Sequence, residues 1–304
     1  MKVVIAGAFG KLGSDITRAF VNAGHEVVAA DMITKQLEDL PEGSYTAVKI
    51  NVQDVESLKG VCDGADAVVT TVGLTTASTT VNNWDIDYQG NVNLLEEAKA
   101  AGVKKFVYTS VINAPEGKDC PMVWAKFQFE EYLRASGVPY VIHRPTGYFY
   151  DIAHVFWPMV LKNKVNILKG TPKVCNVIDT KDFARFILET INEENVIYNV
   201  GGTETYTYQE IAAMFYAANG VEDGPISYAP AWMMDVLAML PKTRREGKKD
   251  LMSFSKFTTG RDCYADTEVP GRSFKEYIAS KEYAPVIEAE LAAKEAAKQA
   301  AKKK

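Results

Sequence analysis

The sequence predicts an α/β protein with a doubly wound parallel sheet and a smaller C-terminal lobe. Short β-branched runs alternate with helical patterns through the first half of the 304-residue chain. Three of the helical patterns end directly before a glycine, which takes the left-handed conformation after a last helical turn at low cost. After about Arg144 the alternation breaks, which indicates a second structural unit.

The first half predicts strands that are buried on both faces, because their apolar runs need not alternate with polar residues. These strands are expected at Val3–Ala6, Glu26–Ala30, Ala47–Ile50, Ala67–Thr71, Lys105–Ser110 and Tyr140–His143. Helices are expected between them at about Leu12–Ala23, Ile86–Ala101 and Val123–Ser136, which stop at Gly24, Gly102 and Gly137. Such strand–helix–strand repetition is typical of a parallel sheet covered on both faces.

The second half predicts a lobe over one end of the sheet. A segment with Pro and aromatic residues, Pro145 to Pro158, precedes short strands or loop at Asn166–Val177. A helix at Asp179–Asn192 and a strand at Val196–Val200 are expected to extend the sheet. Thr207 and Glu210 then have capping-box spacing, which predicts a helix to about Asn219.

Two later segments stand apart. Pro230–Pro241 predicts a proline-bounded helix rich in Met and Trp. Three roles are open for it: packing on the lobe, covering an apolar substrate, or making a dimer contact. The Ala-rich residues 287–304 predict a solvated, fraying helix with charges near i,i+4 spacing.

Composition limits the function classes. Lys and Arg number 34 against 39 Asp and Glu, and the net charge of −5 argues against a general nucleic-acid binder. Four isolated cysteines, Cys62, Cys120, Cys175 and Cys263, argue against a zinc site or disulfide scaffold and fit a reducing compartment. The start of the chain lacks a signal-peptide pattern, and no apolar run approaches the ~20 residues of a membrane span. We therefore expect a cytoplasmic protein with no metal, no nucleic acid and no stable membrane insertion.

The strongest functional signal is G-x-x-G-x-x-G, which follows the first strand and opens the first helix. Gly7 permits the tight turn, Gly10 lets the backbone approach a pyrophosphate, and Gly13 lets the helix pack against the strand. The helix N-terminus then presents free N–H groups to the phosphates. The sequence therefore predicts a Rossmann-type dinucleotide site. Other residues of the turn assigned to the cofactor are Phe9, Lys11 and Leu12.

The second strand ends in Asp31, whose carboxylate can accept hydrogen bonds from both adenosine ribose hydroxyls. That charge would repel a 2′-phosphate, so NAD(H) is favoured over NADP(H). Lys11 is the opposing observation, because a basic residue in the glycine turn can neutralise such a phosphate.

With several later motifs, these residues resemble the short-chain dehydrogenase/reductase superfamily, and within it the atypical or extended, NmrA-like branch. The resemblance covers roughly residues 1–215. The supporting segments are Asn51-Val52-Gln53-Asp54, Val72-Gly73, Asp87 to Leu95, Lys105 to Ser110, Lys126 with Glu130, Arg144 to Gly147, and Asn199 to Gly202.

The resemblance implies roles for residues at the ends of the strands. Asn51 and Val52 would hold the adenine, and an amide oxygen can replace the family's usual aspartate at residue 51. The residues implied beside the pyrophosphate, the riboses and the nicotinamide are Thr71, Val72, Gly73, Thr109, Ser110, Lys126, Pro145, Thr146 and Tyr148.

The chain departs from the family at its proton donor. The family carries Tyr-x-x-x-Lys, whereas here Lys126 is preceded at that spacing by Met122, which cannot transfer a proton. Val111 takes the usual Ser/Thr position unless a one-residue shift puts Ser110 there. The residues assigned to catalysis are Lys126, Tyr148 and Ser110, with Tyr150, His154 and Tyr88 as further candidate acids.

Two functional hypotheses lead. The first is an NAD(P)H-dependent oxidoreductase that transfers hydride to or from a small apolar or conjugated carbonyl substrate. The alternative is a non-catalytic NAD(P)-binding redox sensor or assembly factor of NmrA-like type, and the missing tyrosine also argues against a sugar-nucleotide epimerase. The expected division is a dinucleotide-binding domain over 1–145, returning at about 178–202, a substrate or lid lobe over 146–177 and 203–286, and a charged tail over 287–304. A homodimer contact or a partner protein on the smaller lobe is left open.

Overall fold

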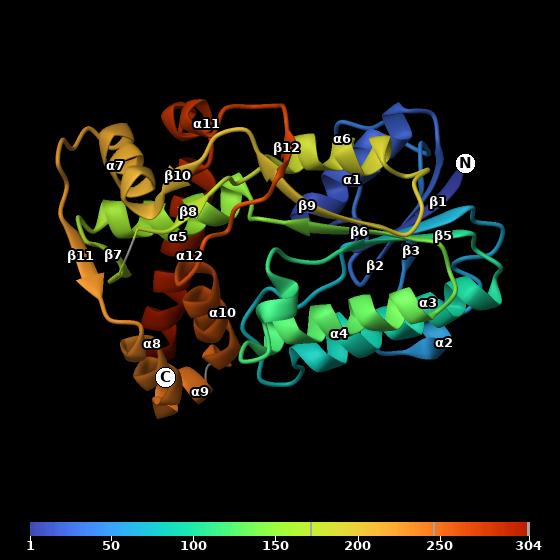
Figure 1. Cartoon of the computed structure of the whole chain (residues 1–304), viewed down its shortest axis with the longest axis horizontal. Coiled ribbons are helices and arrows are strands. Elements are labelled where there is room, and N and C mark those ends of the chain that lie inside the picture. Colours follow the sequence, from blue (N-terminus) through green and yellow to red (C-terminus); the bar gives the residue numbers. More distant parts are fainter. Residues whose placement is uncertain (171, 246, 303–304) are drawn as a thin grey trace.

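The computed structural model describes residues 1–170, 172–245 and 247–302. Its larger part is an eight-stranded sheet in the order β12-β9-β6-β5-β4-β1-β2-β3, in which every pair of neighbours is parallel (Figure 1). The strands are β1 (Lys2–Ala6), β2 (Glu26–Asp31), β3 (Thr46–Lys49), β4 (Ala67–Thr70), β5 (Lys105–Thr109), β6 (Tyr140–Pro145), β9 (Val196–Gly202) and β12 (Thr267–Val269). The order reverses at β1, as the doubly wound prediction requires.

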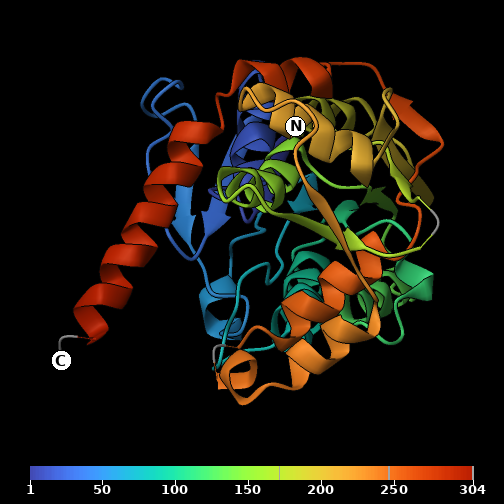
Figure 2. The same cartoon turned by 90° about the vertical axis from the view of Figure 1, so that its left-hand side faces the viewer.

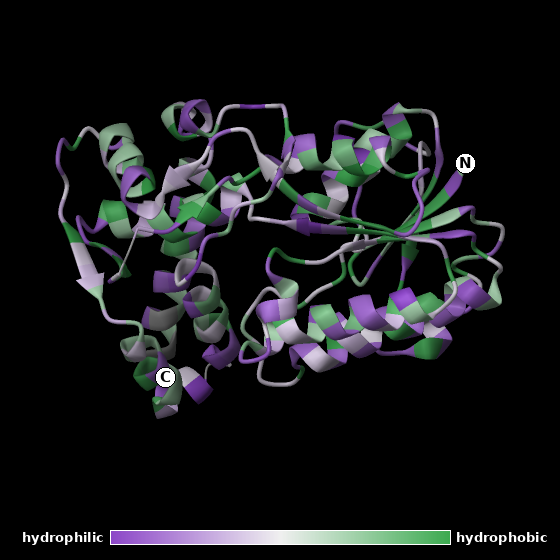
Figure 3. Cartoon of the chain, viewed as in Figure 1, coloured by the Kyte–Doolittle hydropathy of each residue, from purple (hydrophilic) through white to green (hydrophobic). Residues whose placement is uncertain are grey.

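Helices cover both faces of this sheet (Figure 1). One layer holds α1 (Lys11–Asn22) and α6 (Thr180–Glu189), and the other α2 (Val55–Leu58), α3 (Asn91–Ala100) and α4 (Pro121–Ala135). Alternate strand residues enter the two cores: Ile5 and Val107 join the α1–α6 side, and Val4 and Phe106 the α3–α4 side. Because both faces are buried, the central strands are mostly hydrophobic, although β6 also carries His143 and Arg144 (Figure 3).

Helix ends confirm the glycine pattern. Gly24, Gly102 and Gly137 have φ of +79°, +73° and +80°, the left-handed conformation expected after a last turn. The helix expected from Ile86 instead begins as a π-helical segment, η1 (Trp84–Gly90), which continues into α3. A π-helical turn widens the helix locally and is frequent at functional sites.

The remaining elements lie outside the main sheet and its two helix layers, and most of them pack around a second core that forms the smaller lobe. They are the 3₁₀ turn η2 (Ala114–Glu116), α5 (Phe149–Leu161), β7 (Val165–Leu168), β8 (Val174–Cys175), β10 (Tyr206–Thr207), α7 (Tyr208–Ala218), β11 (Ile226–Ala229), α8 (Trp232–Met239), α9 (Pro241–Arg245), α10 (Lys249–Thr259), α11 (Phe274–Ser280) and α12 (Ala284–Lys302). The capping box at Thr207 and Glu210 is present, and Phe156, Phe215 and Phe274 lie in the lobe core.

Three features of the second half were not predicted. β12 comes from the segment assigned to the lobe, yet it pairs with β9 at the edge of the main sheet. The aromatic segment after Pro145 forms the helix α5, with Pro158 inside it. The charged tail is docked where it begins, because Ile287 is buried in the lobe core; α12 then projects away from the molecule (Figure 2). No helix in the described part of the chain is long and apolar enough to span a bilayer.

His143 in β6 gives the fold a pH dependence. Its ring is fully buried, stacks on Tyr198 and contacts Thr190 Oγ1 through Nε2 at 2.9 Å. Burial lowers the pKa of His143 to about 3 from its ordinary 6.5. The unfolded chain therefore binds more protons than the folded chain between these pH values, so stability falls as the pH drops below 6.5.

When the pH falls from 7 to 5, we expect His143 to lower the free energy of unfolding by about 2 kcal/mol. The loss is about 1.4 kcal/mol for each pH unit below 6.5. The neutral variant His143→Gln lacks that contribution. Urea unfolding of both proteins at the two pH values measures it. Equal losses for the wild type and His143→Gln would contradict the assignment.

Candidate functional site

The glycine turn lies at the C-terminal end of β1, where the strand order reverses. Gly7 has a φ of +81°, and its amide donates to Ala30 O of β2 at 2.9 Å. Gly10 is the N-cap residue of α1 and makes no side-chain capping bond. The first amides of α1 are therefore available to an anion, and the helix dipole favours negative charge there.

The three glycines of the turn serve different purposes. A Cβ on Gly13 would lie 1.9 Å from Gly7 O, and one on Gly7 would lie 2.6 Å from Thr71 Oγ1. A Cβ on Gly10 would meet only Gly7 O, at 3.4 Å. Packing within the protein thus requires Gly7 and Gly13, whereas nothing in the protein requires Gly10 to lack a side chain.

Asp31 is held beside this turn. Its Oδ2 accepts from Phe9 N at 2.9 Å and its Oδ1 from Met32 N at 2.7 Å. The carboxylate is therefore oriented at the tip of β2, next to the residues expected to hold the phosphates. The Lys11 side chain instead lies over Tyr150 of α5, with its Nζ 5.9 Å from the ring centroid.

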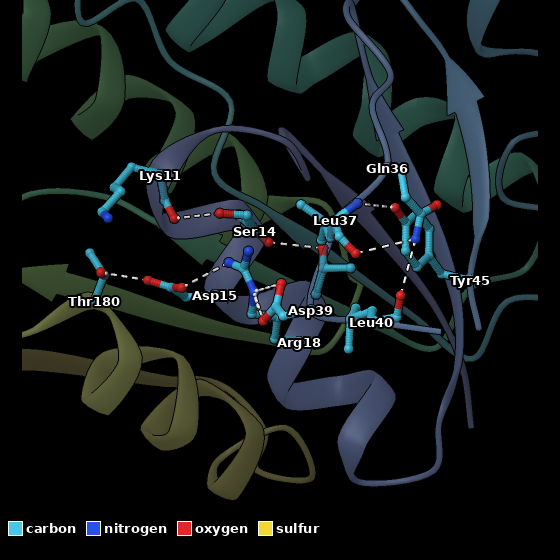
Figure 4. Close-up of polar contacts among 12 residues, drawn as sticks. Lys11, Ser14, Asp15, Arg18, Gln36, Leu37, Asp39, Leu40, Tyr45 and Thr180 are labelled. Atoms are coloured by element: carbon cyan, nitrogen blue, oxygen red, sulfur yellow. Dashed lines mark hydrogen bonds and ion pairs between the residues drawn. The ribbon is translucent and has the colours of Figure 1, made fainter. Parts of the chain in front are cut away.

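Polar contacts anchor α1 to its neighbours (Figure 4). Asp15 accepts from Thr180 of α6 at 2.6 Å and from Arg18 at 3.1 Å, and Arg18 also pairs with Asp39 at 2.7 Å. Asp39 belongs to the loop after Asp31, and Tyr45 holds the same loop by accepting from Leu37 N at 2.9 Å. The glycine turn and the loop beyond Asp31 are thus fixed as one unit.

The ends of β3 and β4 form the neighbouring wall. Thr71 donates to Gly7 O at 3.3 Å, and Asn91 of α3 donates to Val72 O at 3.2 Å. At the end of β3, Asn51 Oδ1 accepts from Gln53 N at 3.1 Å, so the oxygen expected to meet adenine already has one local donor. Val52 is buried, and its carbonyl accepts from Asn93 at 2.8 Å.

Lys126 of α4 forms an ion pair with Asp87 of η1. Lys126 Nζ lies 2.9 Å from Asp87 Oδ1, with side-chain exposures of 12% and 0%. The other carboxylate oxygen accepts from Leu74 N at 3.1 Å and Asn83 Nδ2 at 2.8 Å. A Cβ on Gly73 would lie 2.7 Å from this carboxylate and 2.8 Å from the ammonium. The pair therefore sits directly against the turn that follows β4.

Ser110 lies on a second buried ion pair. Its hydroxyl donates to Glu130 of α4, and Glu130 also pairs with Arg144 of β6 at 2.5 Å. Glu130 has no exposed side-chain surface, so its charge depends on these partners. This arrangement gives Ser110 a structural use, which the sequence did not reveal.

Met122 stands at the spacing where the family carries a tyrosine, and its side chain is buried. It is 5% exposed and lies in an apolar cluster with Val123, Cys120 and Phe257 of α10. The cavity beside it has a volume of about 20 Å³, with Leu74, Asn83 and Leu251 among its lining residues. That space admits about one water molecule. α10 thus covers Met122, which stands at the spacing where the resemblance implies a tyrosine.

The tyrosine candidates lie elsewhere. Tyr148 stacks on Tyr150, with ring centroids 5.8 Å apart, and contacts Phe183 of α6. Burial raises the pKa of Tyr148 well above its ordinary value. Tyr88 packs against Trp84 and Tyr132, and His154 contacts Tyr150 O and lies 3.7 Å from Glu290 of α12. Among Lys126, Tyr148 and Ser110, all of which the structure describes, no hydrogen bond or ion pair joins any two.

In the described structure, the end of β5 carries two buried polar groups without a hydrogen-bond partner, the hydroxyls of Tyr108 and Thr109. Thr109 Oγ1 is buried and makes no hydrogen bond within the described structure, at the place where the resemblance implies a ribose. Pro145 and Thr146 are also buried, and Thr146 Oγ1 donates to Asn176 O at 2.8 Å. No group of three or more His, Cys, Asp or Glu within the described ranges is arranged to hold a metal ion.

Sequence reasoning missed Asp87, Glu130 and Arg144 as partners of the predicted site residues. Asp87 and Glu130 lie in motifs that carry the family resemblance, and both are charged residues within segments that pack on the sheet. That position was the available signal, because a charge facing a core needs an opposite charge. The sequence could not identify which cation each carboxylate meets.

Comparisons with known proteins assign the chain to a nucleotide-binding family. A family model described as NAD(P)H-binding matches residues 7–194. The photosystem II assembly factor Ycf39 of a Synechocystis strain is 26% identical over 234 residues, covering 76% of this chain and 71% of that protein.

Solved structures share the fold. The NADPH-dependent quinone oxidoreductase QOR2 of Escherichia coli is 18% identical, with a TM-score of 0.71 over 91% of this chain and 98% of that one. A short-chain dehydrogenase/reductase superfamily protein of Agrobacterium tumefaciens, solved with bound NAD, is 15% identical, with a TM-score of 0.69 over 97% and 99%.

Proposed function

Because this chain belongs to the NAD(P)H-binding family, among the atypical, NmrA-like short-chain dehydrogenase/reductases, we propose that it is a non-catalytic dinucleotide-binding redox sensor or assembly factor. The observation that carries the proposal is Met122. A residue that cannot transfer a proton is buried under α10 at the place of the family acid. The similarity to an assembly factor agrees with this role.

The residues present fit a dinucleotide. Gly10 and the uncapped N-terminus of α1 receive the pyrophosphate, and Asp31 accepts from the adenosine ribose. Thr109 Oγ1, buried without a partner, can bond to the second ribose. When bound, the nicotinamide supplies hydride chemistry. In this proposal the chain's own residues bind and orient that group and exclude water from one side of it.

An oxidoreductase is the second candidate, and Lys126 favours it. Its ammonium is largely buried, and Asp87 keeps a carboxylate 2.9 Å away. The lysine ammonium can orient a ribose hydroxyl or donate a proton to a reduced product. This route needs no tyrosine.

One experiment separates the two candidates. The protein is incubated with NADH deuterated at either face of C4 and with a small-molecule extract, after binding of each nucleotide has been measured by calorimetry. We expect binding without transfer of deuterium to any metabolite. Label in a product, lost in Lys126→Ala, would overturn the proposal and identify the substrate.

The preference for NAD(H) has its own test. Asp31→Ala should weaken NADH binding about tenfold, because a charge-assisted hydrogen bond contributes about 1.5–3 kcal/mol. Binding of NADPH should improve or stay level, since the repulsive charge is gone. Calorimetric titration with both nucleotides measures the ratio. Tighter binding of NADPH than NADH by the unmodified protein would refute our interpretation of Asp31.

A further inference from the structure

The helix α8 turns its bulky apolar side chains outward. At 100° per residue, five apolar residues of α8 and the residue that follows the helix fall on one contiguous face. These outward residues are Trp232, Met233, Val236, Leu237, Met239 and Leu240, with exposures from 37% to 66%. The opposite side, which carries Met234 and Ala238, is half-buried, and Asp235 pairs with Lys256 of α10 at 2.7 Å. The helix thus packs through its smaller face and leaves the larger one in water.

A dense basic segment follows directly. Residues 242–249 contain five Lys or Arg and one Glu, within a chain whose net charge is −5. Lys242, Arg244, Arg245, Lys248 and Lys249 are exposed. Between α9 and α10 lies a hollow of about 340 Å³, lined by Lys242, Thr243, Lys248, Leu251, Met252 and Ser255. Figures 1 and 2 place α8, α9 and α10 together at one corner of the lobe.

We propose that this corner, α8 to the first turn of α10, docks on an anionic lipid surface. The apolar face of α8 enters the boundary between headgroups and acyl chains, where Trp and Met are favourable, and the basic segment meets the lipid phosphates. Two lysines and two hydroxyls around the hollow match the chemistry of a single phosphate headgroup. This inference goes beyond the proposed function and does not depend on the bound nucleotide.

Charge distinguishes a lipid surface from a second copy of the chain. A twofold dimer through α8 would bring the same patch of each copy together, and therefore two sets of five cations. Such repulsion opposes dimerisation, whereas an anionic bilayer satisfies the apolar face and the cations at once. The docking needs no membrane-spanning helix, because the segment lies in the plane of the interface.

Vesicle co-sedimentation of the full chain tests the proposal. We expect binding to vesicles of phosphatidylcholine with 30% phosphatidylglycerol (about one lipid in three anionic), weaker binding at high salt, and none to phosphatidylcholine alone. Val236→Asp should weaken binding at least about tenfold, since a carboxylate cannot enter the acyl boundary. The matched control is Val155→Asp on α5, because Val155 is 54% exposed and Val236 48%. It should bind as the wild type does.

The charges are tested in parallel. Arg244→Glu/Arg245→Glu should weaken binding about 30-fold or more, since each basic residue near an anionic surface contributes about a fivefold gain. Lys104→Glu/Lys275→Glu makes the same charge change at exposed positions elsewhere and should have little effect. Nucleotide titration and thermal unfolding of each variant show that the fold and the nucleotide site survive.

Three outcomes would overturn the docking proposal. The first is no binding of the wild type to anionic vesicles, and the second is an equal loss in the paired control variants. The third is a dimer, detected by sedimentation, that Val236→Asp dissociates while vesicles bind neither protein. Each of these can occur with nucleotide binding intact, so failure here is distinct from failure of the dinucleotide assignment.

Discussion

Gly10→Val should abolish nucleotide binding while the protein stays folded. The backbone of Gly10 has φ of −68° and ψ of 174°, which any residue can adopt, and a Cβ there would meet only Gly7 O at 3.4 Å. The expected loss of stability is about 1 kcal/mol, the usual scale for a poor N-cap residue. The valine side chain would occupy the space through which a pyrophosphate reaches the amides of α1. Losing one or two charge-assisted bonds there weakens binding about 100-fold or more.

Gly13→Ala is the contrasting variant. Its Cβ would lie 1.9 Å from Gly7 O, so α1 must move off β1 and the fold itself should lose stability. Thermal unfolding and calorimetric titration of both variants therefore give different pairs of results. Unchanged nucleotide binding by Gly10→Val would remove the phosphate-turn assignment, whatever Gly13→Ala does.

The sequence predicted the parallel sheet because each strand carries its own signal. Runs such as Val3–Ala6 are apolar without alternation, and Gly24, Gly102 and Gly137 mark the helix ends locally. β12 was not predicted because its three residues, Thr267–Val269, are too few to show a strand periodicity. They form a strand only by pairing with β9. α5 was not predicted because Pro158 and the aromatic run obscure its helical period. Packing in the lobe core stabilises this helix.

The candidate site also has a part that local sequence could predict and a part that depends on tertiary packing. The glycine turn and Asp31 lie within one strand–helix–strand unit, so their proximity follows from local spacing. Lys126 is different, because its partner Asp87 comes from another helix and the two meet only through the packing of η1 against α4. The sequence identified Met122 as a departure from the family, but its burial beneath α10 depends on Phe257, which lies far along the chain.

Breaking the Asp87–Lys126 pair should destabilise the fold near the site. Asp87→Ala leaves a largely buried ammonium without its carboxylate, and breaking such a pair costs about 3–5 kcal/mol. Asp87→Asn/Lys126→Met removes both charges, and the amide oxygen of the asparagine can still accept from Leu74 N and Asn83 Nδ2, so this double variant should recover most of that loss. Urea unfolding of Asp87→Asn, Lys126→Met and their double variant measures the coupling between the two residues.

The same variants separate a structural role of Lys126 from a role toward the nucleotide. If Lys126 orients the nicotinamide ribose, the double variant should fold well yet bind NADH about tenfold more weakly, since one charge-assisted bond is lost. If the pair only fastens η1 to α4, the double variant should bind NADH as the wild type does. Stability that is unchanged in Asp87→Ala would instead mean that solvent already compensates the ammonium, contrary to the 12% exposure of its side chain.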